Sequence, residues 1–268
     1  MSTQVEISNA KLTPHEAEQV REIAAWKSQP PNPLDELSKT VTLPWARFLE
    51  RIVPDWIVTT TINRSYDLAR ALASPDATKR KAGVEQLAEL RQWPLEECDR
   101  LARRVAASAR LISLFEGGVT GAGGVVTTVL DIPLLFVLSL RTIQKIGHCY
   151  GYALDSEGDR QYVLGVLITA TSGSLDSKRE RLDRLHGLKD WFFEMTQEEI
   201  VADELLSLLF QLEVFEEIPG IGIVSGAALN LFFSRKIDVT ARRVFQERWL
   251  RDNGKVAGIE PAPAPRHV

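Results

Sequence analysis

The chain has 268 residues, of which 44% are hydrophobic and 25% charged, and a formal net charge of -4. These values are typical of a globular protein with a sizeable core and exclude an intrinsically disordered chain. They also argue against a nucleic-acid binder, which normally carries a basic surplus, and the mean hydropathy of -0.09 excludes a polytopic membrane protein.

The two cysteines and the N-terminus indicate the compartment. Cys98 and Cys149 lie in apolar stretches without metal-ligand spacing, which favours buried free thiols in a reducing compartment. The first residues, MSTQVEISNAKLTP, contain no apolar core of a secretory signal. We therefore expect a cytoplasmic protein, and the sequence leaves open whether it also associates with a membrane.

The first predicted helix has a complete start signal. Thr13 supplies a cap hydroxyl, Pro14 suits the first helical position and Glu16 completes a capping box. The helix should end near Lys27, because a proline-rich stretch at 30–33 cannot continue it. Further helices are expected after similar signals at Pro44, Pro54, Pro75 and Pro94.

Apolar residues at helical spacing dominate the later segments. After Pro94 they recur at steps of four and three as far as Phe115, which predicts an amphipathic helix. The charged stretch 177–195 has leucines every three residues and predicts a partly exposed helix. Thr196 and Glu199 form another capping box before an apolar stripe.

Candidate strands are almost absent, so we predict an all-α fold. A single multi-helix domain should span residues 34–252, with a glycine-rich apolar helical hairpin at its centre. Residues 1–33 would add an N-terminal helix and a proline-rich connection. Residues 253–268 would form an extended Pro/Ala-rich tail.

The centre of the chain carries five glycines in eight residues, Gly117, Gly118, Gly121, Gly123 and Gly124. A phosphate-binding loop is disfavoured, since no Lys follows and the spacing does not match a dinucleotide motif. The 24 residues between Glu116 and Arg141 hold a single charge, Asp131, and Pro133 interrupts the run further. An acid at the bilayer centre costs about 2.5–3.5 kcal/mol, so a buried hairpin is favoured and a surface-inserted one stays open.

The glycines have a packing interpretation. Gly117 and Gly121 stand four apart, as do Gly222 and Gly226, so each pair shares a helix face and allows close backbone contact. The segment from Glu217 to Arg235 repeats the plan of the first, with 17 uncharged residues between its ends. The two segments are therefore expected to pack together, and Asp131 is expected to cap the helix that follows the glycines.

The second half of the hairpin carries a polar face. Arg141, Gln144, Lys145 and His148 share one side of a helix, which either lines a site or faces solvent. The four histidines have no metal spacing, and no catalytic motif is present. We expect no metal and no cofactor.

These residues resemble the EcsC protein family, in which a T-G-x-G-G stretch, an Asp-x-Pro and a Tyr-Gly close follow one another. The matching positions are the run 118–124 with Thr120, Asp131-Ile-Pro133, Arg141, and IGHCYGY at 146–152 with Tyr150 and Gly151. A second part of the resemblance runs from Pro219 to Asn230 and continues at ARRVFQERWL, residues 241–250. An acid that often follows the Tyr-Gly-aromatic close is Ala153 here, with Asp155 two places later.

The resemblance implies an accessory or regulatory role at the membrane, because the family is named from a gene that neighbours an ABC-transporter pair. We therefore expect a non-catalytic helical protein that associates peripherally with membrane lipid or such a transporter. One alternative is a hydrolase-like enzyme in which Asp131 is base or cap, Arg141 an anion anchor and His148 an acid or base, with Tyr150 beside them. Another is an interaction module that forms homo-oligomers through Gly222 and Gly226.

Overall fold

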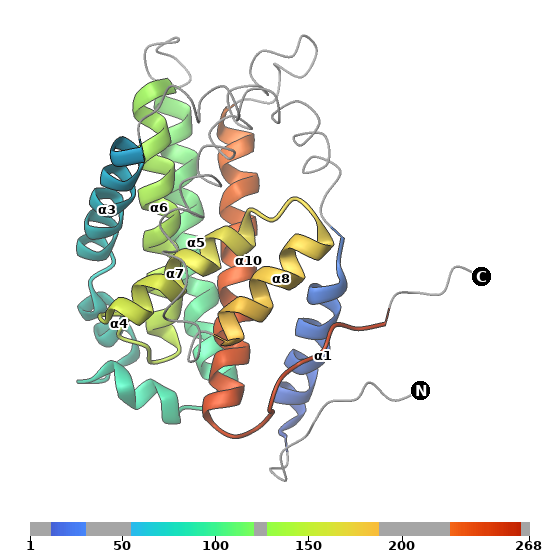
Figure 1. Ribbon diagram of the computed structural model, residues 1–268. Coiled ribbons are helices and arrows are strands. Elements are labelled where there is room, and N and C mark those ends of the chain that lie inside the picture. Colours follow the sequence, from blue (N-terminus) through green and yellow to red (C-terminus); the bar gives the residue numbers. More distant parts are fainter. Residues whose placement is uncertain (1–11, 31–54, 121–127, 188–225, 264–268) are drawn as a thin grey trace.

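The structure is a computed structural model that describes residues 12–30, 55–120, 128–187 and 226–263. Within these ranges it has eight α-helices, one short 3-10 helix and no β-strand, which confirms the predicted all-α class (Figure 1). In chain order the elements are α1 (Pro14–Ser28), α3 (Asp55–Leu72), α4 (Pro75–Ala82), η1 (Leu87–Gln92), α5 (Leu95–Thr120), α6 (Thr128–Cys149), α7 (Glu157–Ala170), α8 (Leu175–Gly187) and α10 (Gly226–Asp252).

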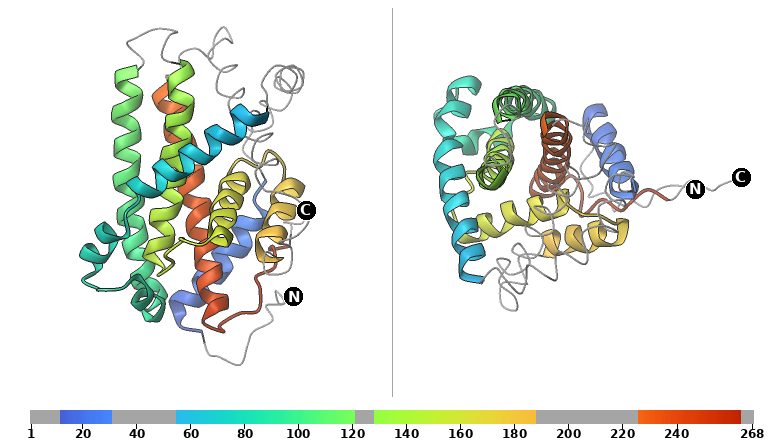
Figure 2. Two further views of the ribbon diagram at one scale, coloured as in Figure 1. Left: turned by 60° about the vertical axis from the view of Figure 1, so that its left-hand side comes forward. Right: turned by 90° about the horizontal axis from the view of Figure 1, so that it is seen from above.

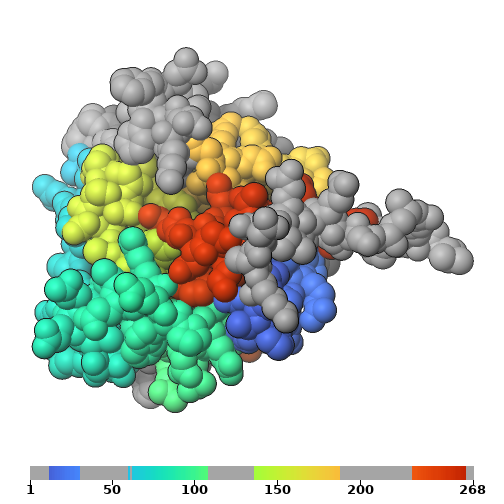
Figure 3. Space-filling model, turned by 90° about the horizontal axis from the view of Figure 1, so that it is seen from below, coloured from blue at the N-terminus to red at the C-terminus, as the bar shows by residue number. Residues whose placement is uncertain are grey.

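The long helix α10 forms the centre of the bundle and packs against α5, α6, α7 and α1 (Figure 2). Helices α5 and α6 lie side by side and run in opposite directions, α3 covers α6, and α8 packs outside α7. Seen from below, the last turns of α10 lie between α1, the start of α5, and α7 with α8 (Figure 3). No helix among the described residues has both the length and the apolar character needed to cross a membrane.

Capping boxes define the starts of two α-helices, α1 and α7. At α1 the predicted capping box is confirmed: Thr13 N donates to Glu16 Oε2 at 2.7 Å, and Glu16 N donates to Thr13 Oγ1 at 3.2 Å. At α7 the same arrangement joins Ser156 and Asp159: Asp159 N donates to Ser156 Oγ at 3.1 Å, and Ser156 N donates to Asp159 Oδ2 at 3.4 Å. These bonds satisfy backbone donors that a helix start leaves free.

Helix α6 ends in a turn that needs glycine. Tyr152 N donates to Gly147 O at 3.2 Å and Gly151 N donates to His148 O at 3.0 Å, the pattern of a Schellman motif. Gly151 has a φ of +85°, and a Cβ there would lie 2.7 Å from Arg91 N. The glycine of the Tyr-Gly-Tyr close is therefore required by both backbone conformation and space.

The same turn sends aromatic rings into the core. Phe245 of α10 lies at the centre of this group, with ring centroids 6.4 Å from Tyr150, 5.7 Å from Tyr152 and 5.5 Å from Tyr162. A Cβ on Gly147 would lie 2.7 Å from Phe245 Cζ, so the missing side chain lets α10 approach α6. Aromatic pairs of this kind contribute about 0.5–1.5 kcal/mol each beyond buried area.

The glycine-rich hairpin is described only in part. Gly117, Gly118 and Thr120 belong to the last turns of α5, and Gly226 and Asn230 to the start of α10. The other motif glycines, at 121, 123, 124 and 222, lie outside the described residues, as does the predicted capping box at 196–199.

The expected cap at Asp131 is corrected by the start of α6. The helix begins at Thr128, so Asp131 lies within its first turns and does not cap it. Pro133 is then inside the helix, where it lacks the N–H that would bond four residues back. The Asp-x-Pro pattern predicted a helix start at Asp131, whereas the helix begins three residues earlier, at Thr128.

The segment after α10 returns along α1. Ala262 N donates to Ala24 O at 2.9 Å, and Ser28 Oγ donates to Ala262 O at 2.5 Å. Val256 and Ile259 are both buried. The first part of the predicted tail therefore belongs to the core.

Replacing Gly151 with Ala tests the turn. We expect a loss of about 3 kcal/mol in the free energy of unfolding, from left-handed backbone strain and from crowding against Arg91. Gly83→Ala is the matched control, because Gly83 has a φ of +73° and nothing within 4 Å of an added Cβ. It should lose only about 1 kcal/mol. Equal losses in urea unfolding would show that the contact with Arg91 does not matter.

Candidate functional site

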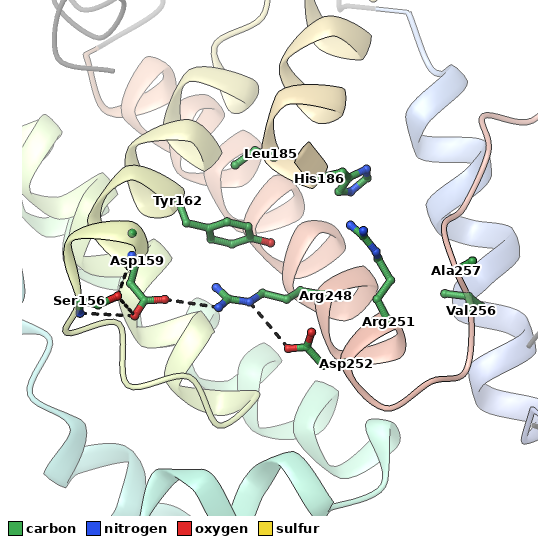
Figure 4. A pocket seen from close by; sticks show the side chains of 11 residues that line it. Ser156, Asp159, Tyr162, Leu185, His186, Arg248, Arg251, Asp252, Val256 and Ala257 are labelled. Carbon is green, nitrogen blue, oxygen red and sulfur yellow. Dashed lines mark hydrogen bonds and ion pairs between the residues drawn. The ribbon is translucent and has the colours of Figure 1, made fainter. Parts of the chain in front are cut away.

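A pocket of about 640 Å³ opens where the start of α7, the end of α8 and the last turns of α10 meet (Figure 4). The segment that follows α10 contributes a further side. The volume is in the range of small-molecule sites, about 300–1,000 Å³. The lining residues are Ser156, Gly158, Asp159, Tyr162, Leu185, His186, Arg248, Arg251, Asp252, Val256 and Ala257.

Arg248 extends from α10 and is held on several sides. Its Nη2 donates to Asp159 Oδ1 at 3.4 Å, and its Nε lies 4.0 Å from Asp252 Oδ2. The guanidinium carbon is 4.2 Å from the ring centre of Tyr152 and 4.5 Å from that of Tyr162. Two carboxylates and two aromatic faces thus orient this guanidinium and offset its charge.

A buried carboxylate lies behind the pocket. Glu247 is 0% exposed, and its Oε1 accepts from Lys27 Nζ at 2.7 Å and from Ile259 N at 3.2 Å. Its Oε2 lies 3.3 Å from His186 Nε2. Burial alone would raise the pKa of Glu247, but His186 and Lys27 outweigh burial and lower the pKa. Glu247 therefore stays ionised and fixes the ring of His186 at the pocket wall.

A second buried carboxylate, Asp99, joins α5 to three other elements. Its Oδ1 accepts from Tyr150 Oη at 2.6 Å and from Gln246 Nε2 at 2.8 Å, and its Oδ2 lies 2.7 Å from His15 Nε2. Burial and the nearby charge of Asp99 raise the pKa of Tyr150 well above its ordinary value. Tyr150 therefore remains a protonated donor inside the core.

The predicted polar face of α6 is packed against its neighbours. Gln144 and His148 are only 1% and 3% exposed. Arg141 Nε donates to Leu72 O at 3.2 Å, at the end of α3, and His148 lies beside the backbone of Ala73. Helices α3 and α4 both pack against α6. This face is a helix–helix contact, and neither of the two sequence interpretations, an open site or a solvated face, describes it.

The four candidate catalytic residues are not brought together. Asp131 and His148 are 17 positions apart on α6, a separation of about 25 Å along the helix. Arg141 and His148 both lie against the end of α3, at Leu72 and Ala73, whereas Tyr150 donates to Asp99 in the core. The four candidates thus do not meet at one site.

The cysteines are buried free thiols, as the sequence predicts. Cys98 Sγ donates to Leu90 O at 3.3 Å, and Cys149 Sγ donates to Lys145 O at 3.2 Å. Burial raises the pKa of Cys98 to about 12 and also raises that of Cys149. Across the described ranges, no group of three or more His, Cys, Asp or Glu side chains is placed to hold a metal ion.

Sequence reasoning missed the pocket. Its basic residues, Arg248 and Arg251, are three apart at the end of α10 and lie within a run that reads as ordinary surface charge. The sequence offered one indication: the two residues between these arginines, Trp249 and Leu250, are large and apolar, and both are buried in the structure. No short stretch of sequence indicates that the start of α7 and the end of α8 lie next to the last turns of α10.

Fold and pocket together define an all-helical bundle protein with a polar pocket beside its central helix. Residues 17–250 match the EcsC protein family, and the chain belongs to that family. It is 29% identical over 170 residues to the uncharacterized protein YdbA of Bacillus subtilis (strain 168), covering 61% of this chain and 62% of that protein. It is 26% identical over 160 residues to Protein EcsC of the same organism, covering 59% of this chain and 66% of that protein.

Both matches therefore span less than two thirds of the length of these relatives. No solved structure matches the chain.

Acid should destabilise the protein through His148. Burial lowers its pKa to about 4, whereas an unfolded His titrates near about 6.5. The unfolded chain therefore binds a proton first as pH falls, and about 2 kcal/mol of stability is lost between about pH 7 and about pH 5. In urea unfolding at both pH values, His148→Gln should show a loss smaller by about this amount. An unchanged pH dependence in the variant would contradict this role.

Proposed function

We propose that this protein is a non-catalytic accessory protein that associates peripherally with a membrane through one end of its helical bundle. The proposal rests on how the charge-poor parts of three helices are placed. The C-terminal end of α5 and the N-terminal ends of α6 and α10 lie at the same end of the bundle (Figure 1).

We call this region the apolar end, and it consists of residues 111–120, 128–140 and 226–234. Its sequence holds two charged residues, Glu116 and Asp131, among many Leu, Ile, Val and Phe. An end of this composition suits a lipid environment better than water.

The length of the apolar end supports shallow insertion. Segments of nine to thirteen residues extend about 14–20 Å as helices. One leaflet contributes about 15 Å of the hydrocarbon core, half of its full thickness of about 30 Å. The apolar end is therefore long enough to enter one leaflet.

Each of the three segments has an arginine next to it in sequence, at its end nearer the bundle body. These residues are Arg110 before the first segment, Arg141 after the second and Arg235 after the third. Basic residues at this depth would meet anionic headgroups, each contributing about 1 kcal/mol near an anionic surface. Membrane binding should therefore weaken as salt increases.

The two acids oppose insertion. Asp131 and Glu116 lie within about one helical turn of the helix ends, where burying a charged carboxylate in lipid costs up to about 3 kcal/mol. Removing one charge should therefore strengthen membrane binding. A catalytic role for Asp131 makes no such prediction.

Vesicle flotation with mixed phosphatidylcholine and phosphatidylglycerol tests the proposal. Wild type should float with the vesicles. Phe232→Glu should weaken binding at least about tenfold, because it places a charge in the apolar end, where the Phe232 ring is partly exposed. Asp131→Asn should strengthen binding.

The matched control is Ala88→Glu, which adds the same charge to an exposed position on η1. It should bind vesicles like wild type, and circular dichroism should show that all variants fold. A wild type that stays with the soluble fraction would overturn the proposal. Retention on native membranes but not on lipid vesicles would also overturn lipid binding and indicate a membrane protein, such as a transporter, as the partner.

A further inference from the structure

We infer that the pocket between α7, α8 and α10 binds a small organic anion, with a phosphate or carboxylate group held by Arg251. This site is separate from the apolar end. Arg251 lines the pocket from the last turn of α10, and its guanidinium points toward His186 (Figure 4).

The charges of the pocket single out Arg251. Arg248 uses its Nη2 for Asp159 and its Nε for Asp252, which leaves only its buried Nη1 without a partner. The guanidinium of Arg251 forms no hydrogen bond or ion pair with any residue in the part of the chain that the structure describes. A guanidinium offers paired donors that match phosphate and carboxylate oxygens, so an anion in the pocket would complete its hydrogen bonding.

His186 adds a second group to the same wall. Its Nε2 lies 3.3 Å from Glu247 Oε2, so the buried carboxylate orients the ring. The ring lies next to the Arg251 guanidinium on the same wall of the pocket (Figure 4).

The first turn of α7 adds to this field. Ser156 and Gly158 line the pocket at the N-terminus of α7, a helix of 14 residues. The positive end of a helix dipole favours an anion there by about 0.3–1 kcal/mol. Both carboxylate oxygens of Asp159 already accept hydrogen bonds, Oδ2 from the helix cap at Ser156 and Oδ1 from Arg248.

The rest of the pocket sets the ligand class. The ring of Tyr162 and the side chains of Leu185 and Val256 provide apolar wall, which suits a flat apolar group attached to the anion. Arg251 is 25 positions from the start of α10, about 38 Å along the helix. A lipid headgroup at the apolar end cannot reach it, so the ligand should be a water-soluble molecule.

Isothermal titration without lipid tests the inference with phenyl phosphate, benzoate and phenol as probes. At least one of the two anions should bind, and phenol, which has the ring without the anionic group, should bind at least about tenfold more weakly, a difference of about 1.4 kcal/mol. Arg251→Gln should raise the Kd of the anion at least about tenfold. Arg179→Gln, a control at an exposed position of α8 outside the pocket, should bind like wild type.

The source of the anion is tested by competition. Inorganic phosphate should compete with phenyl phosphate, whereas vesicles that contain phosphatidic acid should leave binding unchanged. Absence of binding by both anions, or equal binding by wild type and Arg251→Gln, would overturn the inference. Because no membrane takes part in the titration of the free protein, such a failure would leave the vesicle result untouched.

Discussion

The central helix α10 carries charged and amide side chains into the interior, and every one of them needs a partner there. Glu247 meets this constraint with Lys27, and Gln246 meets it with Asp99. Removing one member of a buried ion pair costs about 3–5 kcal/mol, because the other charge is left uncompensated. The positions of α1, of the start of α5 and of the segment after α10 therefore all depend on α10.

Local signals were sufficient to predict the class of fold and several helix limits. The cap at Thr13 and the end of α1 near Lys27 follow from hydrogen bonding and proline geometry within a few residues. Which helix packs over which face of another helix could not be predicted in this way. The spacing of Arg141 and His148 places them on one face of α6, but only the tertiary structure shows that α3 covers that face. Arg251 was missed because the pocket unites three segments, 156–162, 185–186 and 248–257, that are distant from one another in the chain.

The two proposed activities occupy opposite ends of α10. Its charge-poor start belongs to the apolar end, and its last turn supplies Arg248 and Arg251 to the pocket. A protein bound to a membrane at one end would thus keep its pocket open to the surrounding solution. The helix that separates them also carries the buried partners of the core, so a ligand in the pocket contacts the element on which the bundle depends.

The pairing of α1 with α10 and with the segment after it also affects the order of folding during synthesis. Lys27 bonds to Glu247 across 220 residues and to Ile259 across 232. At about 5–20 residues per second, α1 leaves the ribosome roughly 10–45 seconds before its partners exist. Until then α1 can pack only against α5 and α8, and the part of its buried face that contacts α10 stays uncovered. Among the described helices, α1 is therefore made first, and its docking on α10 waits until α10 and the segment after it have been synthesised.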